Sequence, residues 1–217
     1  MAIDLTEPAD AVAGCRARMV ADRAVLVGLS GIDGSGKGYV AARLRDLLEQ
    51  RSKLRVALLN VDGWLNLPAV RFSQRDPGGH FYRQGLRLSE MFARLVLPLR
   101  DRRSIRLDAE YVEETASTYR RHRYQFRDVD VVLLEGIFIY QRAFRAHFDL
   151  AFWIDCSYDT ALDRALRRAQ EGLPPAETIE AYRNIYFPAQ RVHQALDDPR
   201  SGADRIIPND PRLPSAP

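Results

Sequence analysis

The glycine-rich stretch at residues 31–38 constrains the fold more than any other part of the chain. It reads Gly-Ile-Asp-Gly-Ser-Gly-Lys-Gly, follows an apolar run at residues 25–29 and precedes a helical pattern at residues 39–48. A strand, a glycine-rich turn and a helix in this order form a phosphate-binding loop, because backbone N–H groups and the helix N-terminus then face one anion. We therefore expect a nucleotide to contact the loop residues Gly31, Asp33, Gly34, Ser35, Gly36, Lys37, Gly38 and Tyr39.

One position departs from the usual phosphate-loop pattern. The residue after the loop lysine is normally Ser or Thr, whose hydroxyl binds Mg²⁺, and here it is Gly38. The loop alone therefore leaves open whether the site catalyses a reaction or only binds a nucleotide. Without that hydroxyl, Mg²⁺ would be held by carboxylates, phosphate oxygens and water, which suits an ion that retains several waters.

The composition is that of a soluble globular protein. With 217 residues, of which 46% are hydrophobic and 28% charged, the chain is long enough to bury a core. No apolar run approaches the roughly 18 to 20 residues that span a bilayer, so we expect no membrane partner and a cytoplasmic location. Only two cysteines, Cys15 and Cys156, are present, which argues against a disulfide framework or a cysteine metal site.

The basic surplus is too small to indicate a nucleic-acid partner by itself. The formal net charge is +3, and arginines gather at residues 100–106, 120–127 and 164–168. Acidic residues lie near residues 120–127, and no recognised nucleic-acid-binding motif is present. We therefore expect no nucleic-acid partner, and binding through residues 120–127 is the weakest alternative.

Strand and helix patterns alternate along the chain. Branched apolar runs predict buried strands, and apolar residues at three- and four-residue steps predict helices. The predicted strands are residues 25–29, 55–61, 104–107, 129–134, 150–154 and 203–208, and the predicted helices are residues 8–23, 39–48, 86–99, 157–168 and 176–196. Pro188 should end or kink the last helix. The alternation predicts an α/β fold, a doubly wound parallel sheet flanked by helices, with a lid.

We expect one domain over residues 1–217, because no repeat or low-complexity linker divides the chain. Residues 63–79 lack periodicity and are predicted to be a loop that covers the site, within a substrate-side insertion at residues 63–126. Residues 108–126 have no assigned structure. The lid is expected at residues 164–175, and a proline-rich tail at residues 208–217.

Two acids follow predicted buried strands. Asp62 follows the strand at residues 55–61, and Glu135 follows the strand at residues 129–134. Parallel strands end at the edge that also carries the phosphate loop, so both carboxylates should face it. Carboxylates at this place hold Mg²⁺ directly or through water, which predicts Asp62 and Glu135 as metal ligands. The alternatives are that Asp62 only caps its strand and that Glu135 is structural.

The order of these features resembles the uridine kinase and phosphoribulokinase group of P-loop kinases, over residues 25–210. The phosphate loop is common to many families, and the stretches nearest the C-terminus make the resemblance specific. The matching stretches are residues 31–37, Asp62-Gly63-Trp64, His80-Phe81-Tyr82, Leu97-Pro98-Leu99, Leu133-Leu134-Glu135-Gly136, Phe148-Asp149-Leu150, Trp153-Ile154-Asp155, Tyr186-Phe187-Pro188-Ala189-Gln190-Arg191 and Ala203-Asp204-Arg205-Ile206-Ile207.

The resemblance implies transfer of the γ-phosphoryl group of ATP or GTP, with Mg²⁺, to a hydroxyl of a small molecule such as a nucleoside or sugar. It implies that Lys37 holds the phosphates, that Asp62 orients the substrate hydroxyl or accepts its proton, and that Glu135 helps to hold Mg²⁺. Arg164 and Arg168 would close on the phosphates from the lid. The predicted substrate contacts are Asp62, His80, Tyr82, Arg83 and Tyr111.

A departure from the family pattern keeps the acceptor open. Uridine kinases carry a Tyr-Asp pair with a nearby His that reads the base, and here residues 107–111 are followed by no His before His122. Together with Gly38, this supports a second hypothesis, a nucleotide-binding regulatory protein that has lost phosphotransfer. The acceptor, the preferred nucleotide and the oligomeric state, a homo-oligomer included, stay open.

Overall fold

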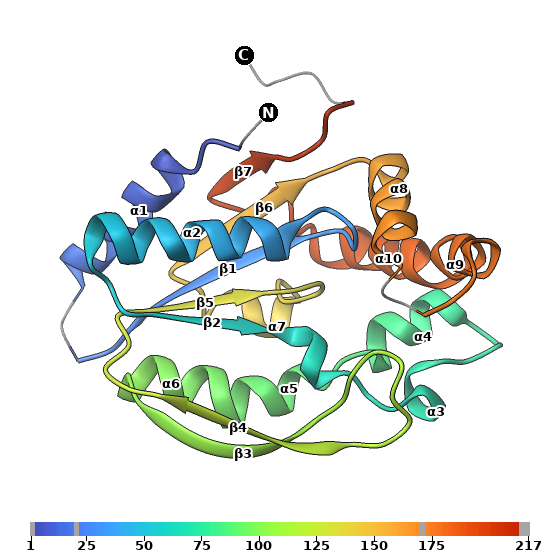
Figure 1. Cartoon of the computed structure of the whole chain (residues 1–217), viewed down its shortest axis with the longest axis horizontal. Helices are drawn as coiled ribbons and strands as arrows, with labels where there is room; N and C mark the ends of the chain where they lie inside the picture. The colour runs from blue at the N-terminus through green and yellow to red at the C-terminus, as the bar shows by residue number, and fades with distance from the viewer. Residues whose placement is uncertain (1–2, 20–21, 170–171, 213–217) are drawn as a thin grey trace.

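The computed structural model describes residues 3–19, 22–169 and 172–212, and a five-stranded sheet lies at its centre (Figure 1). The strand order is β2 (Val56–Asn60), β5 (Val131–Glu135), β1 (Val25–Gly31), β6 (Leu150–Asp155) and β7 (Arg205–Pro208). Every neighbouring pair in this sheet is parallel. β1 and β5 are largely apolar and buried along their whole length, because both faces of the sheet are covered. The doubly wound α/β prediction is confirmed.

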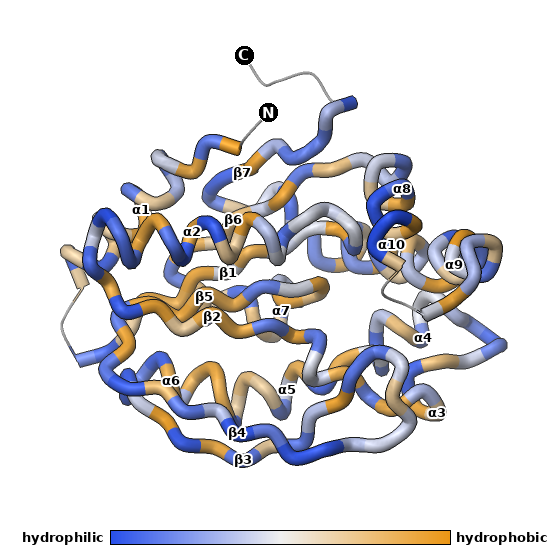
Figure 2. Tube along the Cα trace, in the orientation of Figure 1, coloured by the Kyte–Doolittle hydropathy of each residue, from blue (hydrophilic) through white to orange (hydrophobic). Residues whose placement is uncertain are grey.

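Alternate residues of β1 face opposite layers of helices. Val25, Val27 and Leu29 pack with α1 (Thr6–Arg18) and α2 (Lys37–Ser52), whereas Leu26 packs with the helices of the other face. Because successive side chains of a strand point to opposite faces, one apolar run supplies two cores. Figure 2 shows these apolar strands between the more polar helices.

The first helix is shorter than predicted. The prediction placed it over residues 8–23, but α1 ends at Arg18 because Met19 has an extended backbone. Residues 20–21 lie outside the described part of the chain. The second helix is longer than predicted, because α2 begins at Lys37 itself.

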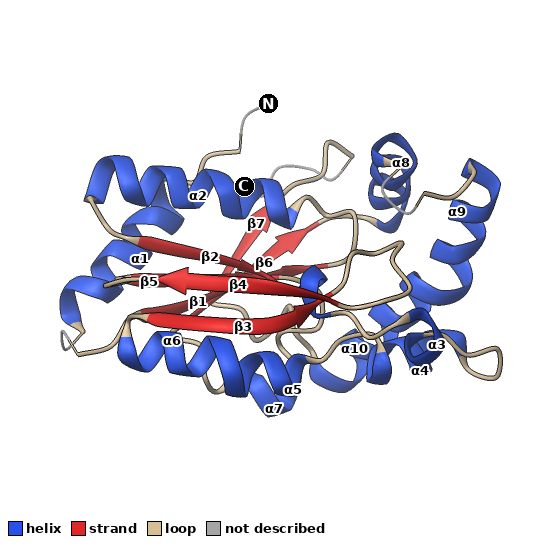
Figure 3. Cartoon of the chain, turned by 60° about the horizontal axis from the view of Figure 1, so that its bottom comes forward, coloured by secondary structure: helices blue, strands red, loops and turns tan. Residues whose placement is uncertain are grey.

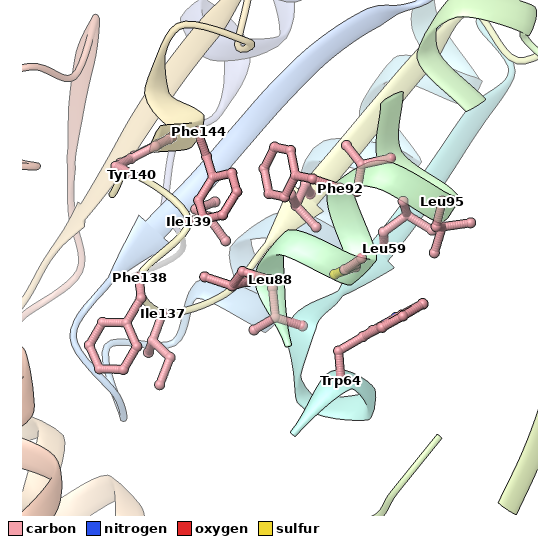
Figure 4. Close-up of a cluster of buried hydrophobic side chains, with 14 of the residues drawn as sticks. Leu59, Trp64, Leu88, Phe92, Leu95, Ile137, Phe138, Ile139, Tyr140 and Phe144 are labelled. Carbon is pink, nitrogen blue, oxygen red and sulfur yellow. The ribbon is translucent and has the colours of Figure 1, made fainter. Parts of the chain in front are cut away.

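The other face of the sheet carries α4 (Pro77–Gln84), α5 (Leu88–Met91), α6 (Leu97–Arg102), α7 (Arg142–Arg145) and α10 (Phe187–Asp197) (Figure 3). The core under this layer is rich in aromatic side chains. Figure 4 shows Phe92 beside Phe144, with Leu88, Leu95 and Leu59 of β2 in the same cluster. The rings of Phe92 and Phe144 are stacked at 4.5 Å.

Two prolines lie inside helical segments without ending them. Pro98 follows the π-helical stretch η2 (Phe92–Val96), and Pro188 follows the π-helical stretch η3 (Tyr182–Tyr186). A π-helical turn bonds residue i to i+5, which widens the helix before the proline ring and removes the need for its missing N–H. The predicted helix at residues 176–196 therefore continues past Pro188, as α9 (Pro175–Ala181), η3 and α10.

The segment predicted to be a loop contains short helices. Residues 63–79 include the end of a 3-10 turn, η1 (Val61–Trp64), then α3 (Pro68–Arg71) and the start of α4. Prolines open both α3 and α4, and a proline is well suited to the first turn of a helix because its missing N–H has no partner there. The same prolines gave the segment its loop-like sequence.

Residues 105–126 form a two-stranded antiparallel hairpin. β3 (Ile105–Tyr111) pairs with β4 (Arg120–Phe126), with Tyr111 opposite Arg120 and Ile105 opposite Phe126. The predicted strand at residues 104–107 was too short, and residues 108–126 had no assignment. The exposed face of the hairpin carries charged side chains, which interrupt the apolar pattern that marks a buried strand.

The predicted lid begins within α8 (Tyr158–Arg168) and ends where α9 begins. Residues 170–171, at its centre, lie outside the described residues, so the lid stays a prediction. The predicted tail at residues 208–217 is partly wrong, because Pro208 belongs to β7 and Asn209 bonds to the backbone of Asp155 at 2.9 Å. Residues 213–217 lie outside the described part.

Within the described residues, every helix is too short or too polar to cross a membrane.

Candidate active site

The phosphate loop connects the end of β1 to the first turn of α2, as its sequence predicts. The backbone is left-handed at Gly34 (φ 77°) and at Gly36 (φ 85°), which side-chain-bearing residues rarely adopt. A Cβ on Gly34 would also lie 2.5 Å from the carbonyl oxygen of Ala161 in α8. Both positions therefore require glycine.

The loop has the features of an anion-binding site. α2 begins at Lys37, so its unpaired N-terminal N–H groups and its dipole point toward the loop. The hydroxyl of Ser35 is buried and has no hydrogen-bond partner among the described residues. Because buried hydroxyls are rarely left unpaired, this one fits a loop built to receive a phosphate.

Asp33 connects the loop to the predicted lid. Its Oδ1 lies 3.8 Å from Lys37 Nζ and 3.9 Å from Arg168 Nη2, and its Oδ2 accepts a 2.5 Å hydrogen bond from the hydroxyl of Tyr182. Burial alone would raise the pKa of Asp33, but Lys37, Arg168 and the Tyr182 hydroxyl hold it below the ordinary value. One carboxylate thus balances two cations where phosphates would bring negative charge.

The two strand-end acids lie at the same edge of the sheet, as predicted. Glu135 is opposite Asn60 in the parallel register, is only 4% exposed, and accepts a hydrogen bond from the Asn60 side chain. Burial raises the pKa of Glu135 to about 7, and the charges of Asp62 and Asp33 add to the shift, although Lys37 opposes it. The residue Asp62 keeps an exposed surface, but the protein atoms packed around its carboxylate desolvate it in part and raise its pKa, against the effect of Lys37.

These two carboxylates fit a hard divalent cation such as Mg²⁺. They offer oxygen ligands, and desolvation is the main cause that raises the pKa of each, so a bound cation would stabilise their charged forms. The described residues contain no cluster of three or more His, Cys, Asp or Glu side chains that could enclose a metal. Phosphate oxygens and water would therefore complete the coordination of Mg²⁺.

Gly38 leaves room for the side chain that it lacks. A Cβ at this position would lie 3.5 Å from Oε1 of Glu135, which is ordinary van der Waals contact. The backbone there is helical, so nothing in the described residues requires glycine at position 38. Tyr39, also predicted to contact the nucleotide, is 56% exposed and accepts a hydrogen bond from Arg43.

The two lid arginines approach the loop from different sides. Arg168 faces Asp33 and also donates to the hydroxyl of Tyr182 at 3.2 Å. Arg164 instead donates to the backbone carbonyl of Ser35 at 3.0 Å. In this structure, therefore, Arg164 supports the loop backbone, whereas Arg168 lies near the side chains expected to meet the phosphates.

Three predicted substrate contacts are engaged elsewhere. His80 Nε2 bonds to the backbone carbonyl of Val70 in α3 at 2.8 Å, and the hydroxyl of Tyr82 donates to Asp197. Arg83 is exposed and pairs with Asp76 at 2.7 Å. Asp197 also bonds to the backbone N–H of residue 142, so Tyr82 ties α4 to the end of α10.

Tyr111 is the predicted substrate contact that lies next to Asp62. A Cβ on Gly63, the residue after Asp62, would be 2.2 Å from the Tyr111 ring. The hairpin also brings His122 to this place, with its ring centroid 5.1 Å from that of Tyr111 and 4.5 Å from that of Tyr124. Tyr111, His122 and Tyr124 are called the aromatic wall below.

His122 was not among the predicted site residues. The alternation of residues 120–126, in which His122, Tyr124 and Phe126 are separated by exposed polar residues, indicates a strand with one inward face that carries His122. His122 is opposite Ala109 in the hairpin register, so it returns to Tyr111 only through pairing across the turn. The sequence spacing between them therefore hid a contact that the fold makes. Tyr182 and Asn209, both bonded to the phosphate loop, were missed for the same reason.

The raised pKa of Glu135 predicts a pH-dependent cost in stability. An unfolded Glu loses its proton near pH 4.5, whereas the folded residue keeps it to about pH 7, so stability falls as the pH rises between these values. Without Mg²⁺ or nucleotide, Glu135→Gln should raise the free energy of unfolding at pH 8 by about 2–3 kcal/mol. The gain should nearly vanish at pH 4.5.

Urea unfolding at the two pH values measures this difference. Glu49→Gln, on the exposed side of α2, is the matched control and should change stability little at either pH. An equal gain in the free energy of unfolding from Glu135→Gln at pH 4.5 and at pH 8 would show that Glu135 does not cause the proposed pH-dependent loss of stability.

No known family profile matches the sequence, and no curated protein matches it. Solved structures do match its fold: one described as a possible uridine kinase from Bacillus stearothermophilus has a TM-score of 0.71 and 17% identity, covering 94% of this chain and 98% of its own. A D-glycerate 3-kinase from Cryptococcus neoformans matches at TM-score 0.64 and 15% identity, over 94% and 95%. A phosphoribulokinase from Rhodobacter spheroides matches at TM-score 0.62 and 13% identity, over 91% and 74%. The chain therefore has the fold of the uridine kinase and phosphoribulokinase group of P-loop kinases.

Proposed function

We propose that this protein is a kinase that uses ATP or GTP with Mg²⁺ and transfers the γ-phosphoryl group to a hydroxyl of a small metabolite. One observation carries the proposal: at the edge that holds the phosphate loop, Lys37 lies close enough to Asp62 and Glu135 to lower the pKa of both, and Glu135 Oε1 would lie 3.5 Å from a Cβ on Gly38. Phosphoryl transfer depends on positioning and on neutralising charge more than on covalent chemistry. These residue types supply both.

Each residue has a definite task in this proposal. Lys37 and the N–H groups of the loop bind the outer phosphates, and Arg168 turns from Asp33 to the incoming negative charge. Glu135 and Asp62 would hold Mg²⁺, which when bound offsets the charge of the phosphates. Asp62, next to the aromatic wall, orients the acceptor hydroxyl, and its raised pKa favours taking up the proton.

The aromatic wall supports a nucleoside or a sugar as the acceptor. Tyr111 lies beside Gly63, and the guanidinium of Arg120 covers its ring at 4.4 Å. Aromatic faces and hydroxyl or imidazole edges bind planar bases by stacking and sugar rings by apolar contact. The names of the structural neighbours, which include uridine kinase, glycerate kinase and phosphoribulokinase, agree with a hydroxylated metabolite.

Gly38 favours one alternative, a nucleotide-binding regulatory protein without phosphotransfer. The loop there lacks the hydroxyl that usually binds Mg²⁺. The buried Glu135 beside Gly38 weakens this alternative, because its carboxylate lies where it can replace that ligand.

A screen for acceptor-stimulated ADP or GDP release tests the proposal. Purified protein is incubated with ATP or GTP, Mg²⁺ and a panel of nucleosides, pentoses and other small alcohols. We expect one chemical class to stimulate release, and Lys37→Ala to abolish the stimulation because it removes the cation that binds the phosphates. Unchanged turnover in Lys37→Ala would overturn the proposal, and tight nucleotide binding without turnover on any acceptor would favour the regulatory alternative.

The aromatic wall predicts a separation of substrate effects. Once an acceptor is found, His122→Ala should raise its KM by about fivefold, the worth of roughly 1 kcal/mol of aromatic contact, and leave the Kd for ATP unchanged. His80→Ala is the matched control, because His80 bonds to backbone away from the wall. Steady-state kinetics and calorimetry measure the two constants. A larger effect on acceptor KM from His80→Ala than from His122→Ala would place the acceptor elsewhere.

A further inference from the structure

The carbonyl oxygen of Ser35, on the outside of the phosphate loop, is held by two side chains from distant parts of the sequence. Asn209 Nδ2 donates to it at 2.7 Å, and Arg164 Nη1 donates to it at 3.0 Å. The two donors also contact each other, with Arg164 Nη2 3.4 Å from Asn209 Oδ1. A single backbone oxygen thus receives a neutral and a charged hydrogen bond.

These two hydrogen bonds to one oxygen fix the orientation of the whole Ser35–Gly36 peptide. The peptide bond is trans, so its C=O and N–H groups point in opposite directions. When the Ser35 oxygen is held on the outer side by Asn209, the Gly36 N–H must point to the inner side of the loop. The ammonium group of Lys37 and the unpaired N–H groups at the start of α2 lie on that inner side.

The peptide needs such a restraint because glycine allows it to turn. Gly36 has a left-handed backbone at φ 85°, and glycine moves between backbone regions at little cost. A Cβ on Gly36 would lie 2.5 Å from Asn209 Nδ2, so the close approach of Asn209 itself also requires glycine there. The loop therefore combines a flexible residue with an external support that limits its flexibility.

Asn209 is itself held in place. Its backbone N–H donates to the Asp155 carbonyl at the end of β6, at 2.9 Å. The next residue, Asp210, accepts from the backbone N–H of Ser157, the N-cap of α8, at 2.7 Å, and from the hydroxyl of Thr160 in the first turn of that helix at 2.6 Å. The segment after β7 therefore joins β6, α8 and the phosphate loop.

We propose that Asn209 is a positioning residue for phosphate binding, and that Arg164 acts with it. By holding the Ser35 carbonyl, Asn209 keeps the Gly36 N–H directed at the phosphates before the nucleotide arrives, which lowers the ordering cost of binding. Arg164 adds a fixed positive charge behind the same peptide. This inference rests on the proposed nucleotide site and assigns a function to a segment outside the loop.

The proposal separates phosphate binding from base binding. If Asn209 acts through the loop peptide, its loss weakens the binding of inorganic triphosphate as much as it weakens the binding of ATP and GTP. If Asn209 instead contacted a nucleobase, its loss would weaken the binding of the nucleotides and leave the binding of triphosphate unchanged. If it only supported the fold, the melting temperature would fall and the affinity of the folded protein would not change.

Calorimetric titrations with ATP, GTP and inorganic triphosphate make this comparison. Asn209→Asp has the same shape and keeps the oxygen that faces Arg164, but it removes the donor to Ser35. We expect it to raise the Kd of all three ligands by about three- to tenfold, in line with one lost hydrogen bond. Asn209→Ala, which introduces no charge, should do the same with an unchanged melting temperature. Arg212→Ala is the control, because Arg212 pairs with Asp163 at the surface, and it should leave all three constants unchanged.

The outcomes distinguish this inference from the proposed function. Failure of the wild-type protein to bind any of the three ligands would overturn both. Wild-type binding that Asn209→Asp and Asn209→Ala leave intact would overturn the role of Asn209 alone, and loss of ATP affinity with triphosphate affinity retained would overturn it as well.

Discussion

The parallel pairing of β5 with both β1 and β2 is the constraint on which the rest of the structure depends. It places Glu135 opposite Leu29 on one side and opposite Asn60 on the other. Since all three strands end at one edge, the phosphate loop after β1, the turn after β2 and the acid that ends β5 are brought together without any further device. The helices on both faces then bury these strands and keep the edge fixed.

The charges at this edge are out of balance in the protein alone. Lys37 lies near three carboxylates, those of Asp33, Asp62 and Glu135, and it lowers the pKa of each while burial raises it. Arg168 and the Tyr182 hydroxyl lower the pKa of Asp33 further, so this carboxylate stays ionised, whereas the pKa of Glu135 is raised to about 7. Such unfavourable burial is typical of functional sites, where stability is given up for chemistry. Bound Mg²⁺ would place positive charge beside these acids and stabilise their ionised forms.

The features predicted correctly from the sequence are local ones. The loop at residues 31–38 and the places of Asp62 and Glu135 at the ends of two buried strands follow directly from strand, turn and helix patterns, which are encoded within a few residues, whereas the roles of the two acids stay predictions. The features missed depend on contacts between distant segments. His122 meets Tyr111 only through the hairpin register, and Asn209 reaches the loop only because β7 pairs with β6. The helix predicted at residues 176–196 is confirmed, and Pro188 does not end it because a π-helical turn precedes the proline.

In the proposed function, the phosphate loop and Asp62 are two halves of one catalytic centre, one for the nucleotide and one for the acceptor hydroxyl. The most direct test compares kcat with the Kd for ATP in Asp62→Asn, which keeps the shape of the side chain and removes its charge. We expect a fall in kcat of about a hundredfold or more, as for loss of a general base, with a much smaller change in ATP affinity. Equal losses in kcat and in ATP affinity would contradict it.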